Sequence, residues 1–194
     1  HLFVTDTGTP ASIAFEQIVW QIRMPRIILG FLAGSGLALC GCVMQAVVQN
    51  PMAGPYILGV ASGATLGATG SLFLGLGVIS GFWAFVGAGS ACFLVLTLSS
   101  ADGKTTSVKL ILSGMIVNAL LTAFSNFIIA VAGDSDGMMS IKFWTMGSLT
   151  RAGWKNIGPI ALIVLAAAVF FRTQAQTLDG LMFGEEAAST IGIN

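Results

Sequence analysis

The sequence predicts an all-α protein that crosses a membrane several times as a polytopic bundle of transmembrane helices. Of its 194 residues, 55% are hydrophobic and only 8% are charged, and the mean hydropathy is +0.90. Soluble domains carry about 25% charged residues, so water cannot be the main solvent of this chain. A transmembrane barrel would show segments of about ten residues that alternate between apolar and polar, and no such alternation is present.

The apolar runs of the sequence predict about five membrane spans, because one crossing needs about 20 apolar residues. The expected spans are 27–48, 57–79, 82–100, 110–132 and 157–171. None of them contains a charged residue, and one charge at mid-bilayer would cost roughly 2.5–3.5 kcal/mol. The turn between the second and third spans is expected at Ser80 and Gly81.

Small residues recur at every fourth position of the first two expected spans. They are Gly30, Gly34 and Ala38 in the first, and Gly59, Gly63 and Gly67 in the second. This spacing lets helix backbones approach closely where lipid provides no hydrophobic drive for association. It therefore predicts packing seams within a compact bundle.

The connections between the expected spans are polar or rigid. Residues 1–26 are expected to form a polar N-terminal segment, and residues 49–56 a short turn that two prolines stiffen. Residues 133–156 are expected to form a loop whose tryptophans lie at the membrane surface. The end of the chain, 172–194, is too polar to span.

Catalytic and metal-binding motifs are absent from the sequence. GKT at 103–105 lacks the first glycine of a phosphate-binding loop, and DSDG at 134–137 is not followed by calcium ligands at the required spacing. The only histidine is His1, and the three cysteines are expected to be small packing residues. We therefore expect no enzyme, no metal site and no cofactor, and the net charge of zero gives no basis for a nucleic-acid partner.

The expected spans also lack the groups that couple transport to an ion gradient. Proton-driven carriers place carboxylates, histidines or lysines within their spans, whereas these spans offer only amides and hydroxyls such as Gln45, Asn118 and Asn126. A transporter built in this way is expected to take its energy from another subunit.

Several motifs in one order resemble a known family. They are RMPRIILGFLAGSGLALCGCVMQAVVQNPMAGPYILGVASGATLGA (23–68), KLILSG (109–114), FWTMGSL (143–149) and LDGLMFGEEAASTIG (178–192). Together they resemble the permease subunits of bacterial ABC importers for iron-siderophores, haem and cobalamin. These permeases have about ten transmembrane helices. The chain is similar to the first half of such a permease without its first helix.

The resemblance implies one transmembrane permease domain over residues 1–194. Residues 1–26 would be an external segment, 27–171 the transmembrane helices, and 172–194 a cytoplasmic segment that couples to the ATPase. The implied partners are cytoplasmic ATP-binding subunits, a periplasmic or lipid-anchored binding protein, and a second permease copy, in the lipid of the bacterial inner membrane.

The resemblance also implies roles for particular residues. Arg23 and Arg26 would receive acidic residues of the binding protein, since arginine keeps its charge and holds a carboxylate bidentately. The residues of the cytoplasmic gate would be Asn50, Pro51, Met52, Thr106 and Ser107. ATPase coupling would fall to Leu178, Leu181, Gly184, Glu185, Glu186, Ala188 and Ile191, with the acids at the start of a short helix.

Two matters stay open at this point. The expected external connections hold Arg23, Arg26, Lys142, Arg151 and Lys155, more cations than the cytoplasmic ones, so the positive-inside rule favours the orientation opposite to the one that the resemblance implies. The sequence also leaves a non-transporting membrane scaffold and an ion-coupled carrier as alternatives to an ATP-driven permease. It does not distinguish an iron chelate, haem and cobalamin as the substrate.

Overall fold

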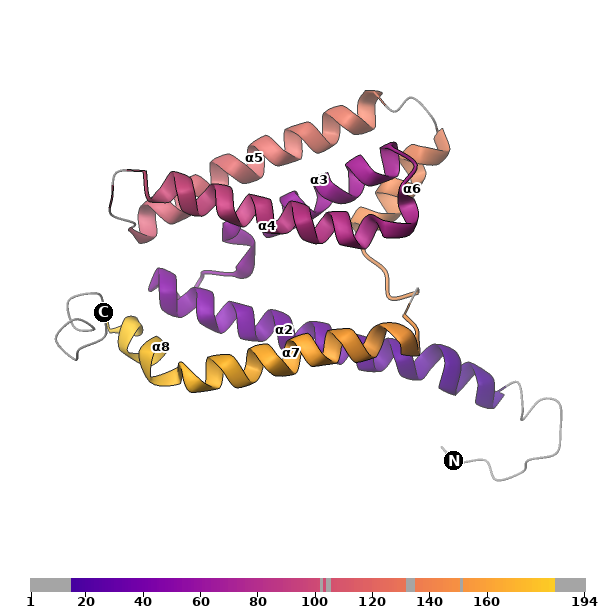
Figure 1. Cartoon of the computed structure of the whole chain (residues 1–194), viewed down its shortest axis with the longest axis horizontal. Coiled ribbons are helices and arrows are strands. Elements are labelled where there is room, and N and C mark those ends of the chain that lie inside the picture. Colours follow the sequence, from indigo (N-terminus) through magenta and orange to yellow (C-terminus); the bar gives the residue numbers. More distant parts are fainter. Residues whose placement is uncertain (1–14, 102, 104–105, 132–134, 151, 184–194) are drawn as a thin grey trace. The chain divides into compact units, whose positions relative to one another are not determined.

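In a computed structural model, the chain is described over residues 15–101, 103, 106–131, 135–150 and 152–183. These residues form helices and turns, and no strand occurs among them. The elements are η1 (Ile18–Arg23), α2 (Met24–Val48), η2 (Pro55–Leu58), α3 (Val60–Phe73), η3 (Gly77–Ile79), α4 (Ser80–Ser99), α5 (Ser107–Val131), α6 (Ser135–Met146), α7 (Trp154–Thr173) and α8 (Ala175–Met182) (Figure 1). The predicted all-α fold is confirmed.

In the part of the chain that the structure describes, four helical segments are long and apolar enough to cross a membrane. They are Phe15–Val48, Ser80–Ser99, Ser107–Val131 and Trp154–Thr173. They coincide with four of the expected spans, because a long charge-free apolar run is a local property that the sequence displays directly.

The first span begins earlier than predicted. Phe15, the first described residue, is already helical, although the span was expected from Ile27, so the Arg-Met-Pro-Arg stretch lies inside a continuous helical segment. Pro25 was expected near a helix start, where its missing N–H does no harm. Instead, the preceding turn widens into the π-helix η1, and a wider turn relieves the clash of a proline ring with the carbonyl before it.

The prediction of a second full-length span over 57–79 is wrong. Its helix, α3, has only 14 residues, about 21 Å at 1.5 Å per residue. Gly59 (φ +66°) and Gly75 (φ +73°) adopt left-handed conformations that interrupt the helix on both sides. The turn to the next helix is therefore at residues 74–76, and Ser80 is the first residue of α4 instead of a turn residue.

The chain separates into two compact units, and the boundary between them falls within α2. One comprises residues up to Leu39 with Ser148–Gln176, and the other comprises Cys40–Gly147 with the residues from Thr177 onward. In the first unit, α7 has no buried residue. In the second, α3 lies against α4 and α5, and its hydrophobic core comprises Met44, Val48, Ala53, Ala91, Val95, Leu110 and Val117.

Glycines bring α3 and α4 into backbone contact, as the small-residue spacing predicted for Gly63 and Gly67. A Cβ atom added to Gly63 would collide with the carbonyl of Gly87, and one added to Gly67 would collide with the carbonyl of Trp83. The other expected seam is weaker. A Cβ on Gly30 would lie 3.5 Å from the Leu149 side chain, whereas one on Gly34 would meet no described atom within 4 Å.

The stretch expected as the loop 133–156 contains the helix α6, which packs against α3. Its Ile141 is only 1% exposed, so burial of one apolar side chain against a neighbouring helix organises this segment. Of the cysteines expected to be packing residues, only Cys92 is partly buried, and Cys40 and Cys42 are exposed.

Candidate functional site

The two arginines of the Arg-Met-Pro-Arg stretch occupy different environments within one helical segment. Arg23 ends the π-helix η1 and is exposed, whereas Arg26 is half-buried in the first turn of α2. Within the described residues Arg23 has no hydrogen-bond or ion-pair partner, and the buried Nε of Arg26 has none either. The guanidinium of Arg23 is therefore the one that a partner can reach.

The turn that precedes α7 lies beside this arginine pair in the same unit. Arg26 Nη2 donates a long hydrogen bond, 3.4 Å, to the carbonyl oxygen of Thr150. Four residues further on, Trp154 Nε1 donates to the carbonyl oxygen of Trp20 at 3.0 Å. Residues more than 120 positions apart in the sequence thus meet along η1 and the first turn of α2, and no sequence motif predicted this contact.

The turn itself is closed by local hydrogen bonds. Ala152 N–H donates to the Leu149 carbonyl at 3.0 Å, and Thr150 N–H donates to Ser148 Oγ at 3.1 Å. The two hydroxyls of Ser148 and Thr150 are 2.8 Å apart and share a further hydrogen bond. These bonds hold the turn that carries the Thr150 carbonyl, which is the acceptor of the Arg26 hydrogen bond.

Residues predicted to form a gate are organised by the end of α2. Gln49 has φ 53°, and the amides of Gln49 and Asn50 bond back to the carbonyls of Ala46 and Gln45. This is a Schellman motif, with glutamine in the left-handed position where glycine is usual. Its extra backbone strain marks a turn that the surrounding structure holds firmly.

Side chains of this turn hold Met52 out toward the surroundings. Asn50 Oδ1 accepts the Met52 amide at 2.9 Å, and Gln45 Nε2 donates to the Pro51 carbonyl at 3.0 Å. The Met52 side chain itself is 88% exposed. Of the predicted gate residues in this turn, Pro51 and Met52 are exposed, and Asn50 is partly buried and bonds to the Met52 amide.

The second half of the predicted gate begins α5. Thr106 lies at the N-cap position, where its hydroxyl accepts the Lys109 amide at 3.4 Å and its carbonyl accepts the Leu110 amide at 2.9 Å. Leu110 and Ala53 belong to the same buried cluster. The structure therefore brings the Asn50–Met52 turn and the Thr106–Ser107 start of α5 to one end of this unit.

The predicted coupling residues are only partly described. Leu178 and Leu181 are half-buried on α8, and the exposed Met182 and Phe183 follow them at the end of this short helix. Gly184, Glu185, Glu186, Ala188 and Ile191 lie outside the described residues. The helix described in this segment is α8, which begins at Ala175, and the short helix expected to start at the acids falls outside the described residues.

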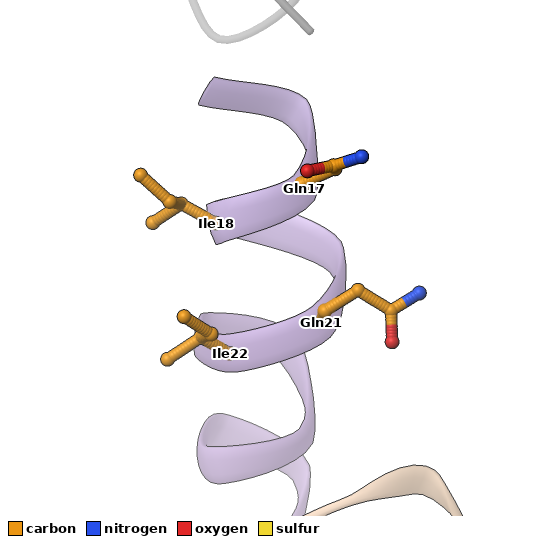
Figure 2. Close-up of a pocket in the computed structure, with 4 residues that line it drawn as sticks. All are labelled: Gln17, Ile18, Gln21 and Ile22. Carbon is orange, nitrogen blue, oxygen red and sulfur yellow. The ribbon is translucent and has the colours of Figure 1, made fainter. Parts of the chain in front are cut away.

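A shallow surface hollow lies on one helical segment. Figure 2 shows Gln17 and Gln21 on one side of it, with Ile18 and Ile22 on the other. All four residues come from a single turn-and-a-half of helix, so the hollow has no opposing wall and is no ligand pocket. Among the described residues no cluster of histidine, cysteine or carboxylate side chains is suited to hold a metal ion.

Several known proteins that are similar to this chain are named as permease proteins. The sequence profile of the FecCD transport family matches residues 4–194. The cobalamin import system permease protein BtuC of Halobacterium salinarum is 36% identical over 189 residues, which are 96% of this chain and 50% of that protein. The molybdate import system permease protein MolB of Haemophilus influenzae is 30% identical, over 99% of this chain and 57% of its own length.

A solved structure shows the same fold. It is described as a metal-chelate type ABC transporter in an inward-facing conformation, and it matches with a TM-score of 0.85 at 27% sequence identity. The match covers 100% of this chain and 61% of that one. The chain spans about half the length of the curated relatives that it matches.

Proposed function

The chain belongs to the FecCD transport family, and we propose on this premise that it forms the membrane-spanning pathway of an ATP-driven importer. The observation that carries the proposal is the charge-free stretch from residue 27 to residue 101, which contains the full 20-residue span of α4. A permease with no Asp, Glu, Lys, Arg or His along this stretch lacks the side chains that relay protons or bind sodium ions in ion-coupled carriers. ATP-binding subunits on the cytoplasmic side would therefore supply the energy.

Three partners complete the proposed importer. A binding protein outside the membrane delivers the substrate and docks on the arginine pair, with Arg23 as its accessible member. A second permease copy forms the other wall of the pathway in the cell membrane. The ATP-binding subunits receive α8, where Leu178 and Leu181 with the exposed end at Phe183 supply apolar contact area, and closure of the ATPases moves the helices as rigid bodies.

The gate follows from the geometry of the turn after α2. Met52 extends from a turn that is fixed by a Schellman motif and two side-chain hydrogen bonds. The methionine side chain is flexible and polarizable, and the turn that carries it is rigid, so Met52 is suited to close a pathway against solutes of irregular shape. The turn that carries Met52 lies at the inner end of the proposed pathway and is held there by the other four gate residues, Asn50, Pro51, Thr106 and Ser107.

The substrate we propose is a bulky metal chelate, with cobalamin favoured over a ferric siderophore or haem. The support for cobalamin is the 36% identity to a cobalamin import permease. Vitamin B12 permeases of Salmonella, at 31% identity, support it as well. A molybdate permease is nearly as similar, so molybdate is an alternative that the experiment must include.

Reconstitution of the full-length permease tests this function. The permease is placed in liposomes with the ATP-binding subunits and the binding protein encoded beside it, and uptake of radiolabelled cobalamin, ferric siderophore, haem and molybdate is compared. We expect cobalamin uptake that needs ATP, both partners and a closed vesicle. Uptake by the permease without its ATPase would overturn the proposal, and ATP-dependent uptake of molybdate alone would overturn the assignment of substrate.

A further inference from the structure

The proline of the Arg-Met-Pro-Arg stretch leaves one backbone carbonyl of the preceding helix without a helical partner. In η1 the Met24 amide donates to the Val19 carbonyl, which is the five-residue register of a π-helix. In that register the next amide, that of residue 25, would bond to the carbonyl of Trp20. Pro25 has no N–H, and the Met24 amide is already engaged, so neither residue can serve the Trp20 carbonyl.

The indole of Trp154 takes this carbonyl. Its Nε1 lies 3.0 Å from the Trp20 oxygen, which is an ordinary length for an N–H to O hydrogen bond. Trp154 is the first residue of α7. The bond therefore joins η1, which continues into α2, to the beginning of α7, and it uses a carbonyl that Pro25 cannot serve.

Two further contacts lie along the same stretch of α2. Arg26 Nη2 reaches the Thr150 carbonyl, and the Leu149 side chain would lie 3.5 Å from a Cβ on Gly30. From Trp20 to Gly30 the three contacts extend over about 15 Å of helix at 1.5 Å per residue. Leu149, Thr150 and Trp154 thus lie along this helical segment, in which Arg26 is half-buried and Arg23 is exposed.

We propose that Trp154 is a positioning residue for binding-protein docking, and that Pro25 creates the acceptor it needs. In this arrangement Arg26 helps to hold the outer turn, and Arg23 is the member of the pair that meets a carboxylate of the binding protein. The docking part rests on the proposed function. The proline-dependent link between α2 and α7 does not, and it can be tested on its own.

A double-mutant cycle on the full-length permease in its assembled complex tests the link. The thermal midpoint is measured for the wild type, Trp154→Phe, Pro25→Ala and the double variant. Trp154→Phe in the wild type leaves the Trp20 carbonyl without a partner, and we expect a loss of about 2–4 °C for one neutral hydrogen bond. With Pro25→Ala the new amide serves that carbonyl, so the same Trp154→Phe change should cost less than half as much.

A matched control separates this effect from the loss of indole bulk. Trp83 is also partly exposed, and its ring packs edge-on against Phe82 in α4. Trp83→Phe should cost the same in the presence of proline and of alanine at position 25. If Trp154→Phe also costs the same in both backgrounds, the proposed link is wrong, whatever the protein transports.

Binding of the purified binding protein at several salt concentrations tests the docking part. Arg23→Gln should weaken binding about 2- to 5-fold, as for an exposed ion pair, and should flatten its salt dependence. Trp154→Phe and Arg26→Gln should weaken binding with the salt dependence kept, and Arg26→Lys should restore part of the loss. Unchanged binding by Arg23→Gln, together with a coupled cycle, would refute the docking role and leave the link standing.

Discussion

A single methyl group at the contact between α3 and α4 should separate two otherwise similar glycine positions. Gly67 lies in backbone contact with α4, and an added Cβ would come within 3 Å of both the carbonyl carbon and the carbonyl oxygen of Trp83. Neither atom can move away by a change of rotamer, since both belong to the backbone of a packed helix. Gly67→Ala must therefore push the two helices apart.

The magnitude follows from the size of the collision. Overpacking a close contact costs typically 1–3 kcal/mol, and alanine returns roughly 0.5–1 kcal/mol through its better helix propensity. Because the collision is with backbone atoms, the cost should lie near the upper end of its range, and we expect Gly67→Ala to lower the free energy of unfolding by about 2–2.5 kcal/mol, or the thermal midpoint by about 4–10 °C. Gly70 lies on the same helix, and its added Cβ would meet no described atom within 4 Å, so Gly70→Ala should leave the midpoint unchanged or raise it slightly.

The assay is thermal unfolding of the purified full-length permease in detergent and again in lipid nanodiscs. Gly89→Ala on α4 serves as a second control, since a Cβ there also has open space among the described residues. Equal midpoints for Gly67→Ala and Gly70→Ala would show that α3 and α4 do not touch through their backbones, and the packing described for this unit would then be wrong.

Three further outcomes follow from the inner end of the permease and from its energy source. Asn50→Ala removes the acceptor of the Met52 amide, a hydrogen bond of about 1 kcal/mol, and should lower the amount of substrate taken up per ATP hydrolysed. Met52→Leu should leave this ratio unchanged. Equal ratios for both variants would exclude a gating role for this turn. Leu181→Asp on α8 should reduce copurification of the ATP-binding subunits, measured by affinity pull-down, while the exposed Gln176→Asp on the same helix should leave it intact. Uptake into reconstituted vesicles should persist when ionophores dissipate the proton and sodium gradients, because residues 27–101 contain no Asp, Glu, Lys, Arg or His. A collapse of uptake with ATP still present would contradict an ATP-driven mechanism.

Local sequence patterns predicted the long helices well and the interrupted ones poorly. A run such as that of α4 is free of charge over a full bilayer thickness, and no other structure satisfies its backbone in lipid. Glycine is ambiguous in this respect. Gly59 and Gly63 share one spacing pattern, yet Gly63 packs within α3, and Gly59 takes a left-handed conformation that ends the preceding turn. Only the tertiary environment decides between these two uses.

Proline position misled the prediction of the first span for a similar reason. Pro25 was expected at a helix start because that is where its missing donor costs least. Here the π-helix before it accommodates the ring, and the indole of Trp154, 134 residues away in the sequence, serves the carbonyl that the proline leaves open. The proline in the sequence indicates that a backbone carbonyl of the preceding turn needs another hydrogen-bond donor. The sequence does not identify the Trp154 indole as that donor.

The separation of roles within the candidate sites has the same physical origin. Motifs in the sequence marked Arg23 with Arg26, and Asn50 with Met52, as pairs, because each pair occurs within one short segment. Burial then distinguishes the members: Arg26 and Asn50 are partly buried, while Arg23 and Met52 are exposed. In both places a side chain that bonds to backbone holds the segment, and its neighbour is free to meet a partner or a solute.

This arrangement fits a permease that contributes shape and leaves the supply of energy to other subunits. A bilayer makes charges costly within the spans, so the proposed function needs its charged contacts with partners outside the spans, and the exposed Arg23 is the residue proposed for one of them. A movement that a partner subunit imposes at the end of a helix reaches the rest of the permease only if the packed helices move as rigid bodies. Backbone contact between α3 and α4 at Gly63 and Gly67 removes the compressible side-chain layer that separates most packed helices. The backbone contact at Gly63 and Gly67 and the absence of charged residues from 27–101 therefore suit the same proposed mechanism. If partner subunits act at the ends of the helices, the helices must transmit that movement without deforming.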